Sequence, residues 1–398
     1  MSILTNVPMA PRDPILGLTE AFVADTRADK ANLGVGVYLG EDGKVPLLDC
    51  VRQAEIALAA APAARGYLPI DGMPTYNAAV RELVFGPDSA AVAAGRVVTV
   101  QGLGGTGGLR IGAEFLKTTS AQRTVLLSTP SWENHQALFS RAGFEVAGYR
   151  YYDADAHAID IDGMLADLAA AEAGTVVVLH ACCHNPTGYD LSLDQWARVA
   201  EVVVAGGLVP FLDLAYQGFA GGLETDRAAV ELFAGLGIPV LVASSFSKSF
   251  SLYGERVGAL SVLSADAEEA ARTLSQLKVT IRTVYSNPPT HGAAVVSRVL
   301  GDPQLRALWE SELTGMRDRI RLLRRKLVDA LVAAGVTQDF SFITDQIGMF
   351  SYIGLSVEQM QRLRAEHGVY GTDAGRICVA ALNEANVAKV AQAIAAVL

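Results

Sequence analysis

Short apolar runs rich in β-branched residues recur along most of the chain and predict buried strands. They lie at residues 97–100, 124–127, 175–180, 208–212, 239–244 and 258–263. Between some of them the apolar residues have helical spacing, as in residues 193–205. Buried parallel strands form near-continuous apolar runs. Strands that alternate with helices form a mostly parallel sheet covered on both faces. The pattern therefore predicts an α/β fold.

The pattern changes after residue 302, where a long helix is predicted. Its apolar residues recur at helical spacing, at Leu305, Trp309, Leu313, Met316, Ile320, Leu323, Leu327 and Leu331. The opposite face, which we interpret as solvated, carries Arg317, Arg319, Arg321, Arg324 and Arg325. Short strands at 348–353 and 377–380 flank a further helix. We therefore expect a smaller α+β domain, which the long helix links to the rest of the chain.

We divide the chain into four segments. Residues 1–12 are proline-rich and are predicted to form an extended arm, and residues 13–45 are assigned to a small domain. Residues 46–305 are assigned to a large cofactor-binding domain. Residues 306–398 are predicted to form the small C-terminal domain, which begins with the linking helix.

Composition narrows the class of partner. The chain has 398 residues, 51% of them apolar, and a net charge of −10, so it is long enough for two globular domains. The negative charge argues against nucleic acid or an anionic membrane surface as a partner. The cysteines match neither a metal site nor a disulfide framework, and no signal peptide or membrane-spanning run is visible. We expect a cytoplasmic protein without a metal.

Candidate chemistry begins just after the predicted strand 239–244. Lys248 follows this strand among serine hydroxyls, and Arg256 comes shortly afterwards. Ligands of open α/β sheets bind beyond the carboxyl ends of the strands. Pyridoxal phosphate needs an amine for its aldehyde and donors for its phosphate, and this stretch offers both. A solvated loop of serine and lysine is the plainer alternative, and the stretch taken alone favours it.

Three predicted strand ends carry polar residues that are expected to converge, namely Asn185, Asp213 and Lys248. The glycine-rich stretch 101–108 follows another strand and precedes a helix predicted to start at Leu109. This order is typical of a phosphate site, because backbone N–H groups and the helix dipole face the anion. The glycines also match G-x-G-x-x-G, but a dinucleotide site needs an acid after the next strand, and none follows 124–127. We therefore favour a phosphate site over a nicotinamide site.

Four motifs are more specific in combination than any of these stretches alone. They are His184-Asn-Pro-Thr-Gly, Asp213-Leu-Ala-Tyr-Gln-Gly-Phe, Ser245-Phe-Ser-Lys followed by Glu255-Arg-Val-Gly, and Tyr285-Ser-Asn-Pro-Pro. Together they resemble the class I aminotransferases, which are pyridoxal-phosphate enzymes of fold type I. The resemblance is closest to the aspartate and aromatic amino acid branch and extends from Asp13 to the C-terminus. It implies a large domain with a mostly parallel sheet covered by helices, and a smaller α+β domain.

The resemblance implies that Lys248, Asp213 and Tyr216 form the reaction centre. Lys248 would bond to the cofactor aldehyde and would move the proton between the substrate α-carbon and the cofactor. Asp213 would keep the pyridine nitrogen protonated, so that the ring can take up electrons. Without Tyr216 nearby, a helix N-cap would be the ordinary explanation for Asp213. Asn185 and Tyr216 would form hydrogen bonds with the 3′-oxygen of the cofactor.

The other cofactor contacts are implied by the same resemblance. The phosphate would be held by Gly105, Thr106, Ser245 and Arg256. Tyr67 would reach the phosphate from a neighbouring subunit. Trp132 would stack on the cofactor ring, and His135 would orient Asp213. Outside this context a tryptophan or a histidine is more often a structural residue.

Two arginines are implied to bind the substrate. Arg376 would bind the α-carboxylate, because a planar guanidinium makes two-point contacts with a carboxylate. Arg282 of the other subunit would bind a distal carboxylate. Gly36, Trp132 and Asn185 are implied to line the same site. Sites shared in this way require a homodimer, whose small-molecule partners are amino acids and 2-oxo acids.

Residues expected near the substrate entrance favour two different selectivities. Leu39, Val45 and Gly66 form a more apolar rim than aspartate-selective members have, whereas Asn287 and Thr106 are typical of those members. We expect an aminotransferase that moves an amino group between an aromatic or acidic L-amino acid and 2-oxoglutarate. The alternative is an aspartate-specific enzyme that converts aspartate and 2-oxoglutarate to oxaloacetate and glutamate.

Two other functions remain open. A decarboxylation or β-elimination on the same fold is disfavoured by the two implied carboxylate-binding arginines, because transamination must accept glutamate and 2-oxoglutarate. A non-catalytic sensor that binds the cofactor is disfavoured because the chain has no spare basic segment for DNA binding. Formation of a 2-oxo acid from an amino acid distinguishes transamination from both.

Overall fold

The computed structural model describes residues 2–10 and 16–398, which divide into two compact units. The smaller unit consists of Met1–Lys44, Leu322–Thr344 and Met349–Leu398, and the larger unit consists of Val45–Arg321 and Asp345–Gly348. The division falls inside one helix, between Arg321 and Leu322, whereas the boundary drawn from the sequence lies at residue 305. Part of the expected arm 1–12, and Asp13 at the start of the family resemblance, lie outside the described residues.

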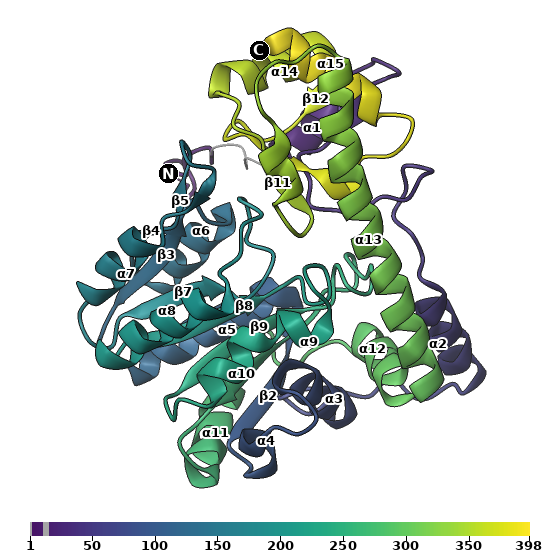
Figure 1. Ribbon diagram of the computed structural model, residues 1–398. Helices are drawn as coiled ribbons and strands as arrows, with labels where there is room; N and C mark the ends of the chain where they lie inside the picture. Colours follow the sequence, from purple (N-terminus) through teal and green to yellow (C-terminus); the bar gives the residue numbers. More distant parts are fainter. Residues whose placement is uncertain (1, 11–15) are drawn as a thin grey trace. The chain divides into compact units, whose positions relative to one another are not determined.

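A seven-stranded sheet forms the centre of the larger unit (Figure 1). In the order β2-β10-β9-β8-β7-β3-β4, the strands span Val97–Leu103, Val257–Leu263, Val240–Ser245, Val209–Leu214, Val176–His180, Thr124–Thr129 and Glu145–Arg150. Every neighbouring pair is parallel except the pairs of β10, which runs antiparallel to β2 and β9. Strand β4 was not predicted, because it lies at the sheet edge and its mostly exposed residues form no apolar run.

Helices cover both faces of this sheet. On one face, α5 (Gly104–Thr119), α6 (Glu133–Ala142) and α11 (Ala267–Val284) form a core with alternate strand residues such as Phe211 and Leu260. The remaining alternate residues face a second layer that contains α3 (Pro74–Phe85), α7 (Ile161–Ala169), α8 (Leu193–Ala205) and α10 (Ala228–Ala234). The unit also contains α2 (Asp49–Ala60), α4 (Ala90–Ala93), β5 (Tyr152–Asp153), β6 (Ala158–Ile159), α9 (Leu223–Asp226) and α12 (His291–Gly301).

The parallel strands all end at the same edge of the sheet. Strand β10 begins at this edge, since Val257 pairs with Leu103 and Gly258 pairs with Ser245. Ligands of open α/β sheets bind at this edge. The loops that follow β2, β3, β7, β8 and β9, together with the loop before β10, are therefore the place to look for a site.

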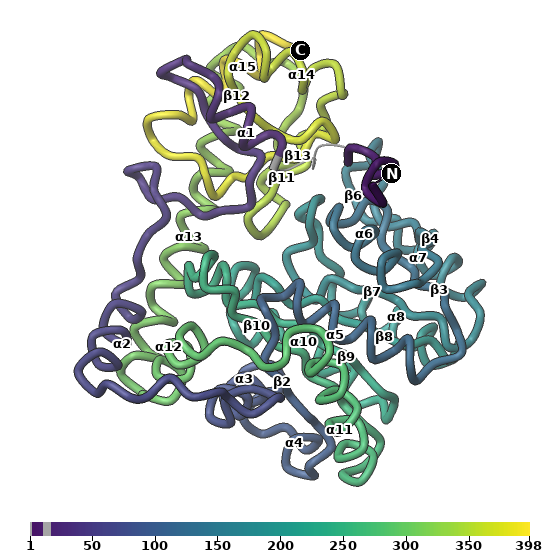
Figure 2. The backbone as a smooth tube through the Cα atoms, turned by 180° about the vertical axis from the view of Figure 1, so that it is seen from behind, coloured from purple at the N-terminus to yellow at the C-terminus, as the bar shows by residue number. Residues whose placement is uncertain are grey.

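The smaller unit brings together the N-terminal and C-terminal parts of the chain (Figure 2). Strand β1 (Ala31–Asn32) pairs in parallel with β12 (Val369–Tyr370), and β11 (Phe350–Tyr352) pairs antiparallel with β13 (Arg376–Cys378). The unit also contains α1 (Leu16–Ala24), η1 (Ser341–Thr344), α14 (Val357–His367), η2 (Val379–Ala381) and α15 (Val387–Val397). In the part of the chain that the structure describes, no helix is both long and apolar enough to cross a membrane.

Helix α13 (Pro303–Ala333) is the long helix that the sequence predicts, but its arginine face is not solvated throughout. Arg324 is only 1% exposed. Its guanidinium donates hydrogen bonds to the carbonyl oxygens of Ile343 and Phe350 and to the hydroxyl of Ser351. The expected solvated face is therefore wrong at this position, because residues that follow the helix in the chain fold against it.

The helix after the glycine-rich stretch begins earlier than expected. We predicted a start at Leu109, but α5 begins at Gly104, so the glycines form its first turns. Glycine is a poor helix former, which is why the sequence pattern places the boundary too late. The glycine backbone therefore lies at the helix N-terminus itself.

Candidate active site

Most of the predicted site residues follow successive strand ends along one edge of the large sheet. They lie after β2 (Gly105, Thr106), after β3 (Trp132, His135), after β7 (Asn185), in and after β8 (Asp213, Tyr216), in and after β9 (Ser245, Lys248) and before β10 (Arg256). The parallel topology thus gathers segments that are far apart in the sequence. Two other predicted residues, Gly36 and Arg376, belong to the smaller unit.

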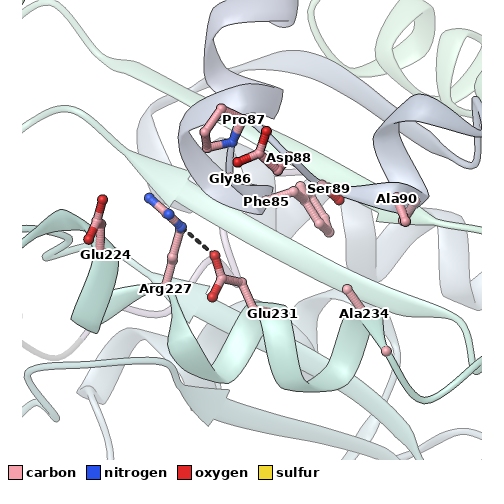
Figure 3. Close-up of a pocket in the computed structure, with 12 residues that line it drawn as sticks. Phe85, Gly86, Pro87, Asp88, Ser89, Ala90, Glu224, Arg227, Glu231 and Ala234 are labelled. Atoms are coloured by element: carbon pink, nitrogen blue, oxygen red, sulfur yellow. Dashed lines mark hydrogen bonds and ion pairs between the residues drawn. The ribbon is translucent and has the colours of Figure 1, made fainter.

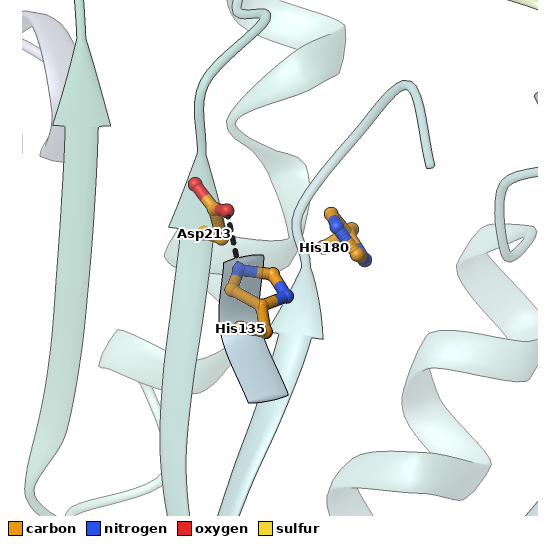
Figure 4. Close-up of side chains that lie close together, drawn as sticks. All are labelled: His135, His180 and Asp213. Carbon is orange, nitrogen blue, oxygen red and sulfur yellow. Dashed lines mark hydrogen bonds and ion pairs between the residues drawn. The ribbon is translucent and has the colours of Figure 1, made fainter. Parts of the chain in front are cut away.

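Asp213 is buried near the end of β8 and is held by His135 from the first turn of α6 (Figure 4). His135 Nε2 lies 3.0 Å from Asp213 Oδ2, and Ser131 Oγ lies 3.0 Å from His135 Nδ1. Burial raises the pKa of Asp213, but the hydrogen bond from His135 and the nearby positive charge of Lys248 act in the opposite direction, and the pKa lies below its usual value. The ionised carboxylate accepts from His135 Nε2–H, and Nδ1 then accepts from the Ser131 hydroxyl.

Two further buried histidines lie beside this pair and were not predicted as site residues. His180 is in register with Asp213 on the neighbouring strand. Its ring centroid lies 5.1 Å from that of His135 and 4.4 Å from that of His184. Burial lowers the pKa of His180 to about 3 and that of His184 well below its usual value. Both rings are therefore neutral at physiological pH. The signals in the sequence were the position of His180 at a predicted strand end and that of His184 at the start of the His184-Asn-Pro-Thr-Gly motif.

Neutral His180 is expected to make the fold sensitive to acid. Its folded-state pKa is depressed below 6.5, so the unfolded chain binds the proton more tightly, and stability falls as the pH drops from about 6.5 towards 3. In this range the free energy of unfolding should fall by up to about 1.4 kcal/mol per pH unit because of His180, and His180→Leu should remove this contribution. Chemical denaturation at pH 5 and pH 7 measures the effect, with His291→Gln, at a half-exposed histidine near Glu55, as control. An unchanged difference between the two pH values in His180→Leu would contradict the assignment.

The first turn of α5, which directly follows β2, packs against Arg256 and has the geometry of an anion cradle. The Gly104 N–H donates to the Arg256 carbonyl at 2.8 Å, and φ is +68° at Gly104 and +55° at Arg256. A Cβ at Gly104 would lie 2.4 Å from Arg256 Nη2, and a Cβ at Gly105 would lie 3.2 Å from Ser245 Cβ. Arg256 Nη1 also donates to Ser247 Oγ at 3.1 Å. Backbone N–H groups at a helix N-terminus, with a guanidinium beside them, attract an anion such as phosphate.

Lys248 lies in the turn that follows β9. Its Nζ lies 4.8 Å from the centre of the buried Tyr216 ring, which belongs to the loop after β8. The face of an aromatic ring stabilises a nearby cation. The charge of Lys248 also helps to lower the pKa of Asp213. An amine, an ionised carboxylate and an anion cradle therefore lie at the ends of neighbouring strands.

Tyr67 and Arg282 are exposed on the larger unit. Tyr67 is 94% exposed, and it lines an open surface depression of about 500 Å³ together with Asn287. Asn287 Nδ2 donates to the Leu68 carbonyl at 3.3 Å, and Arg282 donates to the Ser286 hydroxyl. A tyrosine that is almost wholly in solvent adds little to the packing of its own unit. The exposed surface of Tyr67 is therefore available to a second molecule.

Arg376 begins β13 in the smaller unit and is 2% exposed. Its Nη2 donates to the Gly34 carbonyl at 2.8 Å, and its backbone N–H donates to Thr372 Oγ1 at 3.1 Å. Gly36 belongs to the same unit, and a Cβ there would lie 2.6 Å from Phe350 Cζ. A planar guanidinium can make two-point contacts with a carboxylate. This chemistry makes Arg376 a candidate for binding an anionic ligand.

A separate surface pocket of about 410 Å³ lies in the larger unit, beside α10 and the end of α3 (Figure 3). Arg227 Nε lies 2.6 Å from Glu231 Oε1, so the charge of this arginine is already paired. Glu224 and Asp88 add negative charge to the lining. None of the lining residues is a lysine, histidine or cysteine. The pocket therefore lacks the amine and the imidazole groups that the sheet edge provides.

Comparison with known proteins identifies the family. The family model "Aminotransferase class I and II" matches residues 28–394. The chain is 59% identical to an aspartate aminotransferase of Pseudomonas aeruginosa, with 100% of both chains covered. It is 50% identical to an aromatic-amino-acid aminotransferase of Escherichia coli, over 97% of this chain and 98% of the relative.

A solved structure gives the same result. The aromatic-amino-acid aminotransferase from Burkholderia pseudomallei, covalently bound to pyridoxal phosphate, is similar with a TM-score of 0.98 and 62% identity over 100% of each chain. The chain therefore belongs to the class I and II aminotransferases. The predicted family, enzyme class and type I α/β fold are confirmed.

Proposed function

We propose that this aminotransferase uses pyridoxal 5′-phosphate to move an amino group between aromatic or acidic L-amino acids and 2-oxoglutarate. The observation that supports this most directly is the arrangement at one sheet edge of the ionised Asp213, the Lys248 amine and the cradle around Arg256. We also propose a cytoplasmic location, because no disulfide joins the cysteines.

The residues at the sheet edge suit each part of the cofactor. Its phosphate would be held by Gly105, Thr106, Ser245 and Arg256. Its ring would be held by Trp132, Asn185, Asp213 and Tyr216. The glycine turn is a cradle that a Cβ would fill, as expected where a backbone must closely approach an anion. The ionised Asp213 suits a protonated ring nitrogen, and Lys248 is an amine near that carboxylate.

When bound, the cofactor supplies an aldehyde that bonds to amino groups and a cationic ring that takes up electrons. Asp213 would hold the proton on the ring nitrogen, and His135 would keep Asp213 ionised and oriented. Lys248 would act as the base that removes the substrate α-proton and then as the acid that returns a proton. Arg376 would hold the α-carboxylate of the substrate in two-point contact.

Dual specificity requires one pocket to accept both a distal carboxylate and an apolar ring. Arg282 of the partner subunit would pair with the distal carboxylate of aspartate or glutamate. For an aromatic substrate it would turn towards solvent, because a buried unpaired guanidinium is costly. Leu39 and Val45 would then cover the ring. The high identity to both an aspartate and an aromatic-amino-acid enzyme supports this reading over an aspartate-specific one.

A direct assay tests this substrate range. The purified protein is incubated with 2-oxoglutarate and with aspartate, tyrosine or phenylalanine, and the 2-oxo acid products are measured. We expect turnover with all three amino acids. Turnover with aspartate alone would move the enzyme to the aspartate-specific alternative. Absence of any 2-oxo acid would contradict the proposed function as a whole.

Arg282→Ala is expected to lower kcat/KM for aspartate much more than for phenylalanine. Removing one partner of a buried charge pair costs about 2–5 kcal/mol. Because Arg282 is exposed, we expect a cost at the lower end of this range. The loss in kcat/KM for aspartate should therefore be roughly 30-fold. Phenylalanine has no distal carboxylate, so its half-reaction should change less than about threefold. Arg272→Ala, on the same helix with its own ion pair to Glu268, is the matched control. Equal losses for both substrates would rule out the selective role.

We propose a homodimer in which Tyr67 and Arg282 of the partner subunit complete each active site. The exposure of both side chains on the larger unit supports this assignment. Mixing inactive Lys248→Ala protein with impaired Arg282→Ala protein should then restore activity with aspartate. In a heterodimer one site receives both intact residues, so an equal mixture should reach about a quarter of normal activity. No recovery after verified subunit exchange would contradict shared sites.

A further inference from the structure

The ring of Phe350 packs against the guanidinium of Arg376 in the smaller unit. Strands β11 and β13 pair so that Phe350 lies opposite Cys378 and Tyr352 lies opposite Arg376. Alternate residues of paired strands share one face of the sheet, so Phe350 and Arg376 are diagonal neighbours on the same face. Arg376 Cζ lies 4.4 Å from the centre of the Phe350 ring, which is within cation–π distance.

Several contacts fix this ring in place. Phe350 is 3% exposed, and its carbonyl oxygen accepts a hydrogen bond from the buried Arg324. On another side, the ring occupies the space that a side chain at residue 36 would need, since a Cβ at Gly36 would lie 2.6 Å from Phe350 Cζ. The ring therefore cannot move towards Gly36 and presents its face to Arg376.

Two of the contacts that hold the guanidinium of Arg376 come from different groups of the smaller unit. The Gly34 carbonyl accepts from Nη2 at 2.8 Å, and the Phe350 ring covers the guanidinium from another side. An arginine side chain has many rotamers, and a two-point contact with a carboxylate needs one orientation of its planar fork. Holding the fork in advance strengthens binding, because less freedom is lost when the ligand arrives.

We infer that Phe350 is a positioning residue that orients Arg376 for the substrate α-carboxylate. This inference rests on the proposed role of Arg376 and extends it to a residue that does not itself contact the carboxylate. Every substrate carries an α-carboxylate, so loss of the ring should weaken the binding of acidic and aromatic substrates equally. In this respect Phe350 differs from Arg282, whose removal should affect acidic substrates selectively.

Phe350→Leu is expected to raise KM for aspartate and for phenylalanine by roughly 3- to 30-fold each, the range that corresponds to loss of a buried cation–π contact. We expect kcat to stay within about threefold, and the ratio of the two KM values to stay within about twofold. The dissociation constant of 3-phenylpropionate, a carboxylate without an amino group, should rise by a similar factor. Phe342→Leu is the matched control, because Phe342 is a buried phenylalanine of the same unit that stacks on Phe340 instead.

A double-mutant cycle distinguishes positioning from general support of the fold. If Phe350 acts through Arg376, Phe350→Leu should cost less than about twofold in kcat/KM when Arg376 is already alanine. The same full loss in that background would overturn the inference, and so would an unchanged KM in Phe350→Leu alone. If Arg376→Ala itself leaves KM unchanged, the proposed role of Arg376 fails first, and the inference fails with it. Phe350→Met, which also lacks the ring, replaces Phe350→Leu if that variant does not fold.

Discussion

Replacing Lys248 with alanine is expected to lower kcat for transamination by roughly 10⁴-fold or more. A positioned proton-transfer group contributes about 10²–10⁴-fold, and Lys248 is proposed to bond to the cofactor as well. Alanine removes the amine but leaves the other proposed cofactor-binding residues, including Asp213 with its bond to His135 and the cradle at Arg256. The variant should therefore still take up pyridoxal phosphate while producing almost no 2-oxo acid in a steady-state assay.

Lys117→Ala is the matched control for this experiment. Lys117 is an exposed lysine in the last turn of α5, at the opposite end of that helix from the glycine cradle. Its replacement should leave kcat within about twofold, as is usual for surface substitutions. Borohydride reduction of the unmodified protein, followed by peptide mass analysis, should find the cofactor attached to Lys248. Attachment to another lysine, or turnover of Lys248→Ala within tenfold of normal, would contradict the assignment.

Asp213→Asn is expected to lower kcat by about 10²–10³-fold, the cost of removing one preorganised electrostatic contact from an active site. Asparagine has nearly the shape of aspartate but carries no charge, so it cannot hold a proton on the ring nitrogen. Burial opposes the ionised state of Asp213, but the hydrogen bond that its carboxylate accepts from His135 favours this state and helps to outweigh burial in the unmodified protein. The variant should keep most of its bound cofactor, so the loss should lie in kcat rather than in cofactor content.

Asp226→Asn separates this effect from the loss of a buried carboxylate in general. Asp226 is 2% exposed and accepts backbone hydrogen bonds from Gly218 and Gly221, each at 2.7 Å. Its replacement should lower stability, because it loses charge-assisted bonds to the backbone. The kcat of the folded fraction should stay close to normal. Near-normal turnover in Asp213→Asn would mean that Asp213 has only a structural role.

The sheet and its functional edge were predictable because the strands are buried. Strands β7 and β9 begin with the apolar runs 176–179 and 240–243, so their boundaries agree with the sequence pattern to within a residue or two. The parallel topology then places Asp213 and Lys248 at one edge without any further information. Strand β4 escaped prediction because it lies at the sheet edge, where exposed polar residues interrupt the apolar pattern.

Other features depend on tertiary contacts that no local pattern encodes. The spacing of α13 places Arg324 at the border of the apolar face, four residues after Ile320, but its burial depends on the later segment that includes Phe350. The pKa of His180 is lowered mainly by burial and further by His135, which α6 brings close to the His180 ring, and neither effect can be read from the local sequence. The packing of Phe350 on Arg376 depends on the register of two three-residue strands.

The central claim is transamination through a cofactor that alternates between two forms. A single-turnover measurement tests this claim most directly. The cofactor-loaded protein is mixed with aspartate, or separately with phenylalanine, in the absence of any 2-oxo acid acceptor. The account predicts one equivalent of the corresponding 2-oxo acid per active site with each amino acid, and no more until 2-oxoglutarate is added. Continuous turnover without an acceptor, release of carbon dioxide, or absence of 2-oxo acid would contradict it.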